Sequence, residues 1–146
     1  SVAAAHGAAV VIDVNGLSIK DIKAQVKDAA KKLGAPGTCW RIFEMSGTKA
    51  GQETAFALIG QGAHLSIVGF TMAKLEVRLS NLMAFDATVR GNWGCDPELY
   101  PEVLEWIGAG RLKVSPFVEK HALAEMNGVL DAAHAGTLKK RAVLVP

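Results

Sequence analysis

The residues best suited to ligand chemistry are two short glycine turns, each of which follows an apolar run. Residues 40–45 form the first run, which ends at Ser46-Gly47, and residues 65–68 form the second, which ends at Gly69. A helix-compatible segment joins the runs, which predicts two parallel strands connected by a crossover helix. In open α/β sheets, ligands bind in the crevice beyond the carboxyl ends of the strands. A binding site is therefore expected at these two turns.

Two isolated titratable residues stand at the ends of predicted strands. Asp13 has the position of a ribose-binding carboxylate, but that acid follows a glycine-rich turn by about 20 residues in dinucleotide folds, and no such turn precedes it here. His64 lies at the edge of the second strand, where it is either a catalytic base or a histidine with a local hydrogen bond. The structural interpretation is the simpler one for both residues.

The chain contains two cysteines, Cys39 and Cys95, which lie far apart in the sequence. Neither belongs to a CxxC motif or to a Cys/His cluster, so a zinc site made by this chain alone is not expected. We expect both residues to be buried free thiols.

Composition indicates an ordinary globular protein. The 146 residues are 50% hydrophobic and 21% charged, which suits a single folded domain with a sizeable core. The net charge is +2, and the basic residues are dispersed apart from Lys139, Lys140 and Arg141, which argues against a nucleic-acid partner. No apolar run approaches the roughly 18–20 residues of a membrane span, and the first residues lack the features of a signal peptide. We therefore expect a cytosolic protein without membrane partners.

The first third of the chain predicts two helices and one strand. Residues 1–7 resemble the tail of a helix, and residues 8–14 form a β-branched run typical of a buried parallel strand. Ser18 and Asp21 have the spacing of a capping box, which starts a helix that continues to Leu33 with its lysines facing solvent.

The rest of the chain alternates between helix and strand patterns. The expected elements are a helix over residues 50–59, a short helix over 80–85, a strand over 88–93 broken by Gly91, a helix from Asp96 to Ile107, a strand or extended link over 111–118, a helix over 123–133 and a strand over 141–145. This order predicts the α/β class, with a doubly wound parallel sheet and an appendage.

Three short motifs and a closing pattern follow one another along the chain. The motifs are FEMSG at residues 43–47, HLSIVGF at 64–70 and RGNWG at 90–94, and the closing pattern covers residues 116–146. In this order they resemble the carboxyl-terminal part of the zinc-type medium-chain alcohol dehydrogenase/reductase family. Within that family, residues 40–52, 76–87 and 91–101 are most similar to members that act on an alicyclic acyl-CoA in anaerobic aromatic degradation.

The resemblance implies a partial Rossmann fold that lacks its first two strands. Residues 1–110 would be a partial nucleotide-binding domain, and residues 111–146 a carboxyl-terminal segment that completes the catalytic domain of the full-length enzyme. In the usual strand order 3-2-1-4-5-6, residues 8–14 match strand three, whose neighbours are absent. That strand either stands apart, moves beside residues 40–45, or pairs with polypeptide outside this sequence. We therefore expect the chain to be a fragment of a larger enzyme.

The resemblance also implies which residues contact the cofactor. The expected contacts are Met45, Ser46, Gly47 and Thr48 with the adenosine half, Val68, Gly69 and Phe70 with the nicotinamide, Asn92, Trp93 and Gly94 with its carboxamide, and Arg141 with the phosphates. Simpler alternatives remain. Met45 and Val68 could be core residues, and Arg141 could form a surface ion pair worth under about 1 kcal/mol.

The implied activity is the NAD-dependent oxidation of a secondary alcohol on an acyl-CoA substrate by the full-length enzyme. Zinc would be bound outside this chain, which lacks the family's Cys/His ligands and its GxGxxG loop. No catalytic or metal-binding residue is therefore assigned here, and the chain alone is expected to be inactive. A homodimer or homotetramer would form through residues 88–93. The alternatives are a non-catalytic nucleotide-binding module and a zinc-free protein similar to quinone reductases; the choice between NAD and NADP stays open.

Overall fold

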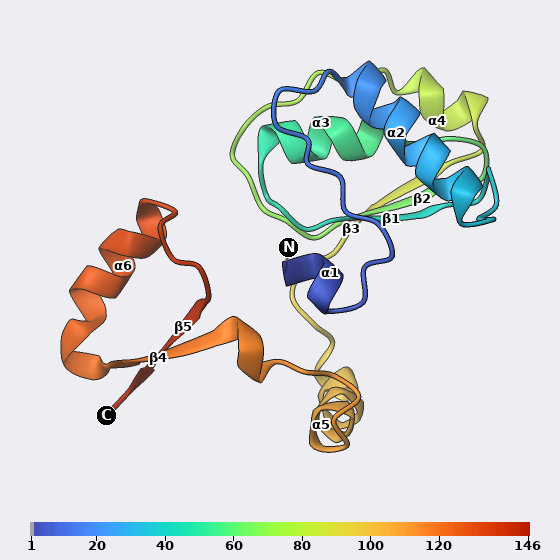
Figure 1. The fold of residues 1–146 in the computed structure, drawn as a ribbon. Helices are drawn as coiled ribbons and strands as arrows, with labels where there is room; N and C mark the ends of the chain where they lie inside the picture. Colours follow the sequence, from blue (N-terminus) through green and yellow to red (C-terminus); the bar gives the residue numbers. More distant parts are fainter. Residues whose placement is uncertain (1) are drawn as a thin grey trace. The chain divides into compact units, whose positions relative to one another are not determined.

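The predicted strand–helix–strand unit forms the centre of the first part of the chain. In the computed structural model, which describes residues 2–146, strand β1 (Arg41–Glu44) leads through helix α3 (Lys49–Ala57) to strand β2 (His64–Ile67) (Figure 1). The two strands are parallel, as predicted. Strand β3 (Thr88–Gly91) joins β2 in parallel on its other side, which gives the order β1-β2-β3. The α/β class with a parallel sheet is confirmed.

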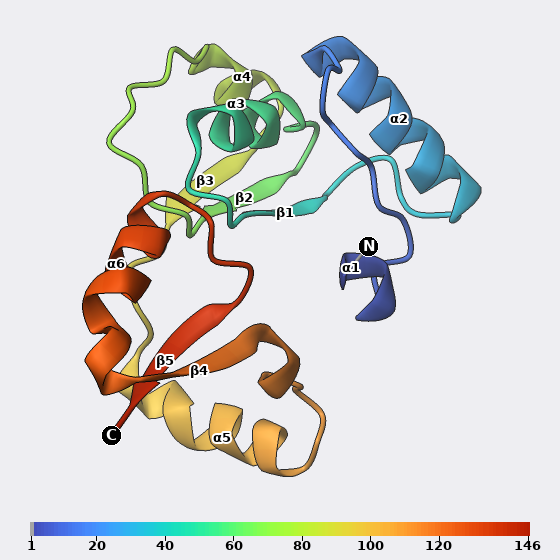
Figure 2. The same cartoon turned by 60° about the vertical axis from the view of Figure 1, so that its left-hand side comes forward.

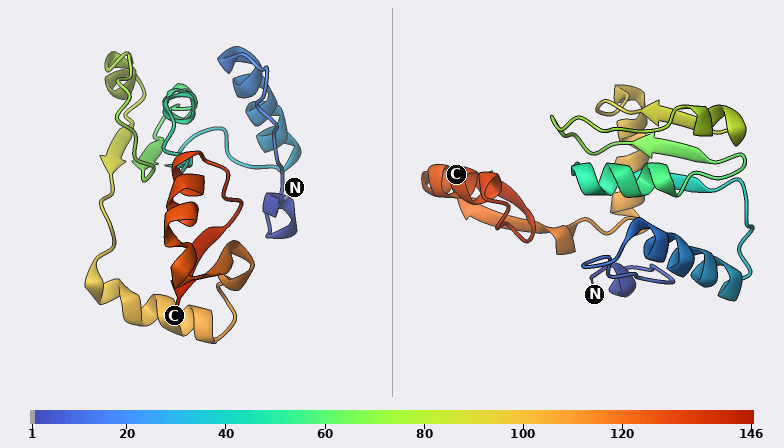
Figure 3. Two further views of the ribbon diagram at one scale, coloured as in Figure 1. Left: turned by 90° about the vertical axis from the view of Figure 1, so that its left-hand side faces the viewer. Right: turned by 90° about the horizontal axis from the view of Figure 1, so that it is seen from above.

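A small core lies between this sheet and its helices. Leu65 is fully buried and packs with Ala55, Ile59 and Ala63, while helix α4 (Ser80–Ala84) and the residues around it add partly buried side chains. Helices α3 and α4 lie on the same side of the sheet (Figure 3). The other face of β1 is uncovered in this unit, and Phe43 is 65% exposed there. Burial is therefore concentrated on one face of the sheet.

Helix α2 (Ile19–Lys32) forms where the sequence predicts it. The Ser18 Oγ atom accepts a hydrogen bond from Asp21 N, and the Asp21 carboxylate accepts one from Ser18 N, so the predicted capping box is confirmed. Ile22 is the buried residue of the apolar stripe, whereas Leu33 at the carboxyl end is 57% exposed. The apolar face of α2 is therefore only partly covered by the residues that the structure describes.

The strand predicted over residues 8–14 is wrong. A short helix, α1 (Val2–Ala5), precedes this segment, which pairs with no other strand among residues 2–146. Val10 and Val14 are exposed. The β-branched composition favours a strand, but a strand also needs a partner for its backbone groups. The segment stands apart from the sheet and does not lie in the ladder beside β1.

A second compact unit begins at Cys95 and has its own two-stranded parallel sheet (Figure 2). Its elements are the 3₁₀ helix η1 (Pro97–Leu99), α5 (Tyr100–Gly108), η2 (Ser115–Phe117), β4 (Val118–Ala122), η3 (Leu123–Glu125), α6 (Met126–His134) and β5 (Arg141–Val145). The strand or extended link predicted over residues 111–118 is wrong in its position. Pro116 lies in the 3₁₀ turn η2, and the strand starts only at Val118. The domain boundary predicted after residue 110 concerns the complete protein and stays a prediction.

Both cysteines are exposed, so the prediction of buried thiols is also wrong. Cys39 lies in the turn before β1 with a positive φ of 59°. Cys95 begins the second unit. Within residues 2–146, no helix is long and apolar enough to cross a membrane.

Candidate functional site

The turns after β1 and β2 lie in direct backbone contact at one edge of the sheet. A Cβ atom on Gly69 would lie 2.6 Å from Gly47 Cα and would also overlap Gly47 N. A Cβ atom on Gly47 would lie 2.7 Å from the Phe70 carbonyl oxygen, and Gly47 has a φ of +62°. Both positions therefore require glycine. The sequence places these two turns correctly at one edge of the sheet, the edge where a ligand is expected in an open α/β sheet.

Glu44, the last residue of β1, accepts hydrogen bonds from the amides of both turns. Its Oε1 atom accepts from Ser46 N at 2.8 Å, from Ser46 Oγ at 2.5 Å and from Gly47 N at 3.2 Å. Its main-chain carbonyl oxygen accepts from Val68 N at 2.9 Å and from Gly69 N at 3.0 Å. One residue thus binds four amides, two from each turn.

The carboxylate of Glu44 is buried, with 3% of the residue exposed. Burial alone would raise its pKa, but hydrogen bonds from the side chain of Ser46 and from the Ser46 and Gly47 amides, together with the nearby amide group of Gln52, lower the pKa below its ordinary value. Glu44 is therefore ionised at neutral pH. Its Oε2 atom is also buried and makes no hydrogen bond within residues 2–146.

Gln52 on helix α3 connects the second turn to this arrangement. Its Nε2 atom donates a hydrogen bond to the Gly69 carbonyl oxygen at 3.1 Å. Sequence reasoning missed both Gln52 and Glu44 as site residues. The available signal was an acidic residue inside an apolar strand, two positions before a Ser-Gly turn, since a buried carboxylate needs hydrogen-bond donors.

The predicted residues Ser46 and Thr48 complete the first turn. Thr48 is the N-cap of α3, and its Oγ1 atom accepts a hydrogen bond from Gly51 N at 3.0 Å. Thr48 N donates to Ser46 Oγ at 3.2 Å. The polar groups of this turn therefore hold the turn itself together.

The surface of the two turns includes three exposed apolar side chains. Met45 is 66%, Val68 43% and Phe70 72% exposed. The alternative that Met45 and Val68 are core residues therefore does not hold within the part of the chain that the structure describes. The turns can therefore offer a ligand these apolar side chains, main-chain carbonyl groups and the exposed residues Ser46 and Thr48.

The third strand ends at the same edge of the sheet. Gly91 is the register partner of Ile67, and Asn92 N donates a hydrogen bond to the Ile67 carbonyl oxygen at 2.9 Å. Asn92 is therefore brought beside the second turn. Trp93 is 94% exposed, and Gly94, with a φ of +60°, closes the first unit.

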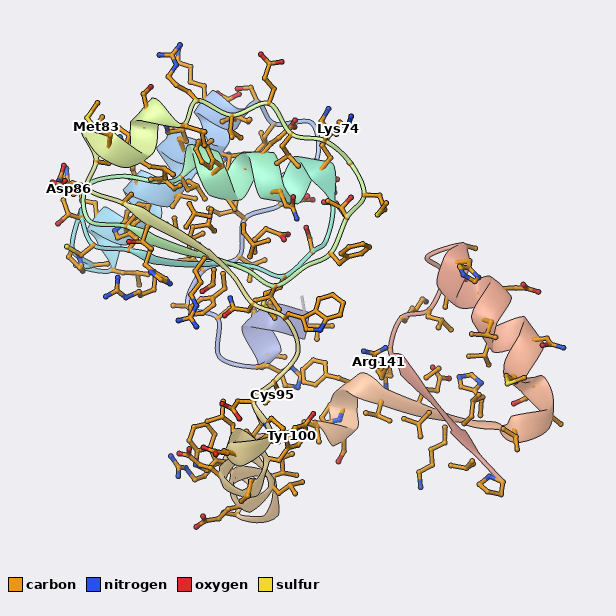
Figure 4. All side chains as sticks on the ribbon, turned by 180° about the vertical axis from the view of Figure 1, so that it is seen from behind. Lys74, Met83, Asp86, Cys95, Tyr100 and Arg141 are labelled. Carbon is orange, nitrogen blue, oxygen red and sulfur yellow. The ribbon has the colours of Figure 1, made fainter. Side chains whose placement is uncertain are left out.

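The three remaining candidates lie in other segments of the chain. Asp13 accepts a hydrogen bond from Asn15 N at 3.0 Å and serves a local turn. His64 opens β2 and so lies at the opposite end of the strand from Gly69. Arg141 opens β5 in the second unit (Figure 4), and its approach to the turns stays a prediction.

No group of three His, Cys, Asp or Glu side chains within residues 2–146 is arranged to hold a metal ion. In the second unit, the Nδ1 atom of His121 and the Oε2 atom of Glu125 lie 3.8 Å apart. Two side chains at that distance do not make a zinc site. The residues described here therefore do not fit a zinc ion.

A second feature of the first unit is an apolar groove of about 620 Å³ along the open edge of β1. Its apolar lining includes Val10, Ile12, Val26, Ala29, Leu33 and Ile42. These residues come from the segment before α2, from α2 itself and from β1. The groove therefore explains why the stripe of α2 is incompletely covered.

Comparison with known proteins identifies the relatives of this arrangement. A family model described as zinc-binding dehydrogenase matches residues 1–109. Among curated proteins, no relative matches the sequence. Solved structures share the fold. An alcohol dehydrogenase from the archaeon Aeropyrum pernix has a TM-score of 0.80 and 24% identity, over 99% of this chain and 39% of that one.

Two further solved structures give the same result. Benzyl alcohol dehydrogenase from Acinetobacter calcoaceticus has a TM-score of 0.78 and 18% identity, over 98% of this chain and 38% of that one. Galactitol-1-phosphate dehydrogenase from Escherichia coli has a TM-score of 0.78 and 16% identity, over 99% of this chain and 42% of that one. The present chain thus spans about two fifths of the length of each of these proteins.

Proposed function

The chain belongs to the zinc-binding dehydrogenase family, and we propose that it is the part of an NAD-dependent alcohol dehydrogenase that holds the nicotinamide end of the cofactor. The observation that carries this proposal is the contact between the Gly47 and Gly69 turns at the carboxyl ends of adjacent parallel strands. This is the edge at which open α/β sheets bind nucleotides.

The exposed groups of the turns suit a flat aromatic ring. Val68 and Phe70 supply apolar surface for a nicotinamide ring, and Met45 supplies it for the adenosine half; such surface packs against flat rings and excludes water from them. The amides of residues 46, 47, 68 and 69 already donate to Glu44, so the turns offer carbonyl oxygens and the hydroxyl groups of Ser46 and Thr48. Such acceptors match ribose hydroxyls and the amino group of a carboxamide. Bound NAD would supply the hydride acceptor.

Other parts of the chain have supporting roles in this proposal. Asn92, Trp93 and Gly94 would lie beside the carboxamide, and Arg141 would approach the cofactor phosphates. Zinc, which the family description implies, would be held by polypeptide outside this chain. The isolated chain would therefore bind no zinc and show no turnover.

The edge of β1 that is unpaired within residues 2–146 is evidence for a larger sheet in the complete enzyme. The carbonyl oxygens of Trp40 and Glu44 accept hydrogen bonds from the amides of His64 and Val68. Main-chain groups of a strand alternate in direction, so the N–H and C=O groups of Arg41 and Phe43 face away from β2. Parallel strands are usually covered on both faces and paired on both sides. We propose that strands of the same enzyme fill the adjoining groove and complete the nucleotide-binding domain that ends near residue 110.

The substrate and the assembly are finer parts of the proposal. The similarity of residues 40–52, 76–87 and 91–101 to one group of dehydrogenases supports 6-hydroxycyclohex-1-ene-1-carbonyl-CoA, oxidised to its 6-oxo product during anaerobic benzoyl-CoA degradation. All four residues of β3 are exposed, and its outer edge is unpaired among residues 2–146. This supports a homodimer or homotetramer formed through residues 88–93.

The test is a comparison of the complete protein with the 146-residue chain. The complete protein should reduce NAD with the alicyclic hydroxyacyl-CoA, and the chain alone should not. Turnover of a quinone with NADPH would favour a relative of the quinone reductases. Nucleotide binding without turnover of any alcohol would favour a binding module.

A further inference from the structure

Glu44 accepts hydrogen bonds from the main-chain amides of both glycine turns. Its carboxylate binds the amides of Ser46 and Gly47, and its main-chain carbonyl binds those of Val68 and Gly69. We propose that Glu44 is a positioning residue that fixes the two turns relative to each other and thereby aligns the nicotinamide end of the cofactor with its adenosine end. This inference rests on the function proposed above.

The two turns are packed directly against each other and against the Glu44 carboxylate. The Oε2 atom of Glu44 lies 2.8 Å from the point where a Cβ atom on Gly69 would stand. The backbones of Gly47 and Gly69 are themselves in contact. A shift of the Glu44 carboxylate would therefore move the first turn, through its two amides, and press on the second.

Gln52 on helix α3 also binds the second turn. Its amide donates to the Gly69 carbonyl oxygen at 3.1 Å and also stabilises the Glu44 carboxylate. The second turn is thus held through its amides by the Glu44 carbonyl and through its own carbonyl by Gln52. A substitution of Glu44 or Gln52 should therefore change the positions of both turns.

A contribution to stability does not by itself explain why a carboxylate occupies position 44. A buried ionised group with one unpaired oxygen is costly, and an apolar side chain would suit a strand better. Hydrogen bonds to an ionised acceptor are roughly twice as strong as neutral ones and restrict geometry more tightly. The arrangement therefore favours a fixed turn geometry over maximum stability.

The test uses the complete protein and two probes, NAD⁺ and ADP-ribose, which lacks the nicotinamide. Calorimetric dissociation constants are compared for wild type, Glu44→Gln, Glu44→Ala and Gln52→Ala. Glu53→Gln serves as the control. Glu53 follows Gln52 on helix α3, and its carboxylate forms an ion pair with Lys49 at 3.7 Å. Circular dichroism and thermal unfolding establish that each variant is folded at the temperature of the titration.

We expect Glu44→Ala to weaken NAD⁺ binding about tenfold, because two partly buried amides lose their acceptor. Glu44→Gln keeps the shape without the charge and should give a smaller loss. For both variants, and for Gln52→Ala, the loss should be at least about threefold larger for NAD⁺ than for ADP-ribose, because the second turn shifts with the first. Glu53→Gln should leave both constants unchanged.

Each other outcome has a distinct meaning. Equal losses for the two probes would overturn the coupling of the turns, since Glu44 would then act on the adenosine side alone. Unchanged NAD⁺ binding in a folded Glu44→Gln variant would overturn the role of Glu44 while leaving the proposed function intact. If the wild-type protein binds neither probe, the proposed function and this inference both fail. Should Glu44→Ala not fold, Glu44→Gln decides the question.

Discussion

The backbone of Gly69 lies directly against that of Gly47, so that a Cβ atom on Gly69 would stand 2.6 Å from Gly47 Cα. Two residues separated by a strand, a helix and a loop are thereby brought into contact at the end of the sheet. The contact depends on the parallel pairing of β1 and β2, which places both carboxyl ends side by side.

Substitution Gly69→Ala should destabilise the chain by about 2 kcal/mol or more, because the added methyl group meets backbone that cannot move aside. Urea denaturation followed by circular dichroism measures the loss. Gly60→Ala is the control, since a Cβ atom there has no atom within 4 Å. An equal effect at the two glycines would contradict the described packing.

The stability of the first unit should depend on pH through Glu44. The pKa of this carboxyl is lowered in the folded state by the hydrogen bonds it accepts, against the opposing effect of burial. A lowered folded pKa adds stability above the ordinary value of 4.5, and this stability is lost as the pH falls through the folded pKa. Unfolding free energies between pH 3 and pH 7 should therefore fall on the acid side for wild type and fall less for Glu44→Gln. Parallel curves would show that Glu44 is not stabilised in its charged form.

The N-cap of α3 should contribute measurably to the first turn. Thr48 Oγ1 accepts from Gly51 N at 3.0 Å, and Thr48→Ala should lower the unfolding free energy by about 1 kcal/mol. Ser80→Ala is a suitable comparison, because α4 begins without a side-chain cap. If the two substitutions cost the same, the cap of α3 is not formed in solution.

The isolated chain should associate through the open edge of β1. Unpaired strand edges template further pairing, and Phe43 adds an exposed apolar face. Phe43→Lys should lower the apparent mass in light scattering, whereas Leu79→Lys, at a residue that is 68% exposed before α4, should not. Association that is insensitive to Phe43 would point to another surface.

Local patterns predicted much of this fold because they depend on neighbouring residues. The capping box of Ser18 and Asp21, the turn at Gly47 and the strand at Arg141–Val145 each follow from short-range chemistry. The failures depend on distant partners. Residues 8–14 have strand composition but no ladder, and the exposure of Cys39 depends on which surfaces surround it.

The candidate site was predicted in position but not in its internal chemistry. Parallel strands place the turns at Ser46-Gly47 and Gly69 on one edge whatever the side chains are. That Glu44 points inward, and that Gln52 reaches Gly69 across the helix, depends on packing that no local pattern encodes. The position of Arg141 relative to the turns depends on how the units 1–94 and 95–146 are arranged. Sequence spacing does not determine that arrangement.

The proposed function places the nicotinamide ring at the turn after β2 and the adenosine half at the turn after β1. The most direct measurement is the set of intermolecular nuclear Overhauser effects between the ring protons of bound NAD⁺ and methyl-labelled Met45 and Val68 in the complete protein. We expect strong effects between the nicotinamide protons and Val68, and effects to Met45 from the adenosine protons instead. Saturated NAD⁺ binding with no effect to either methyl group would contradict this placement.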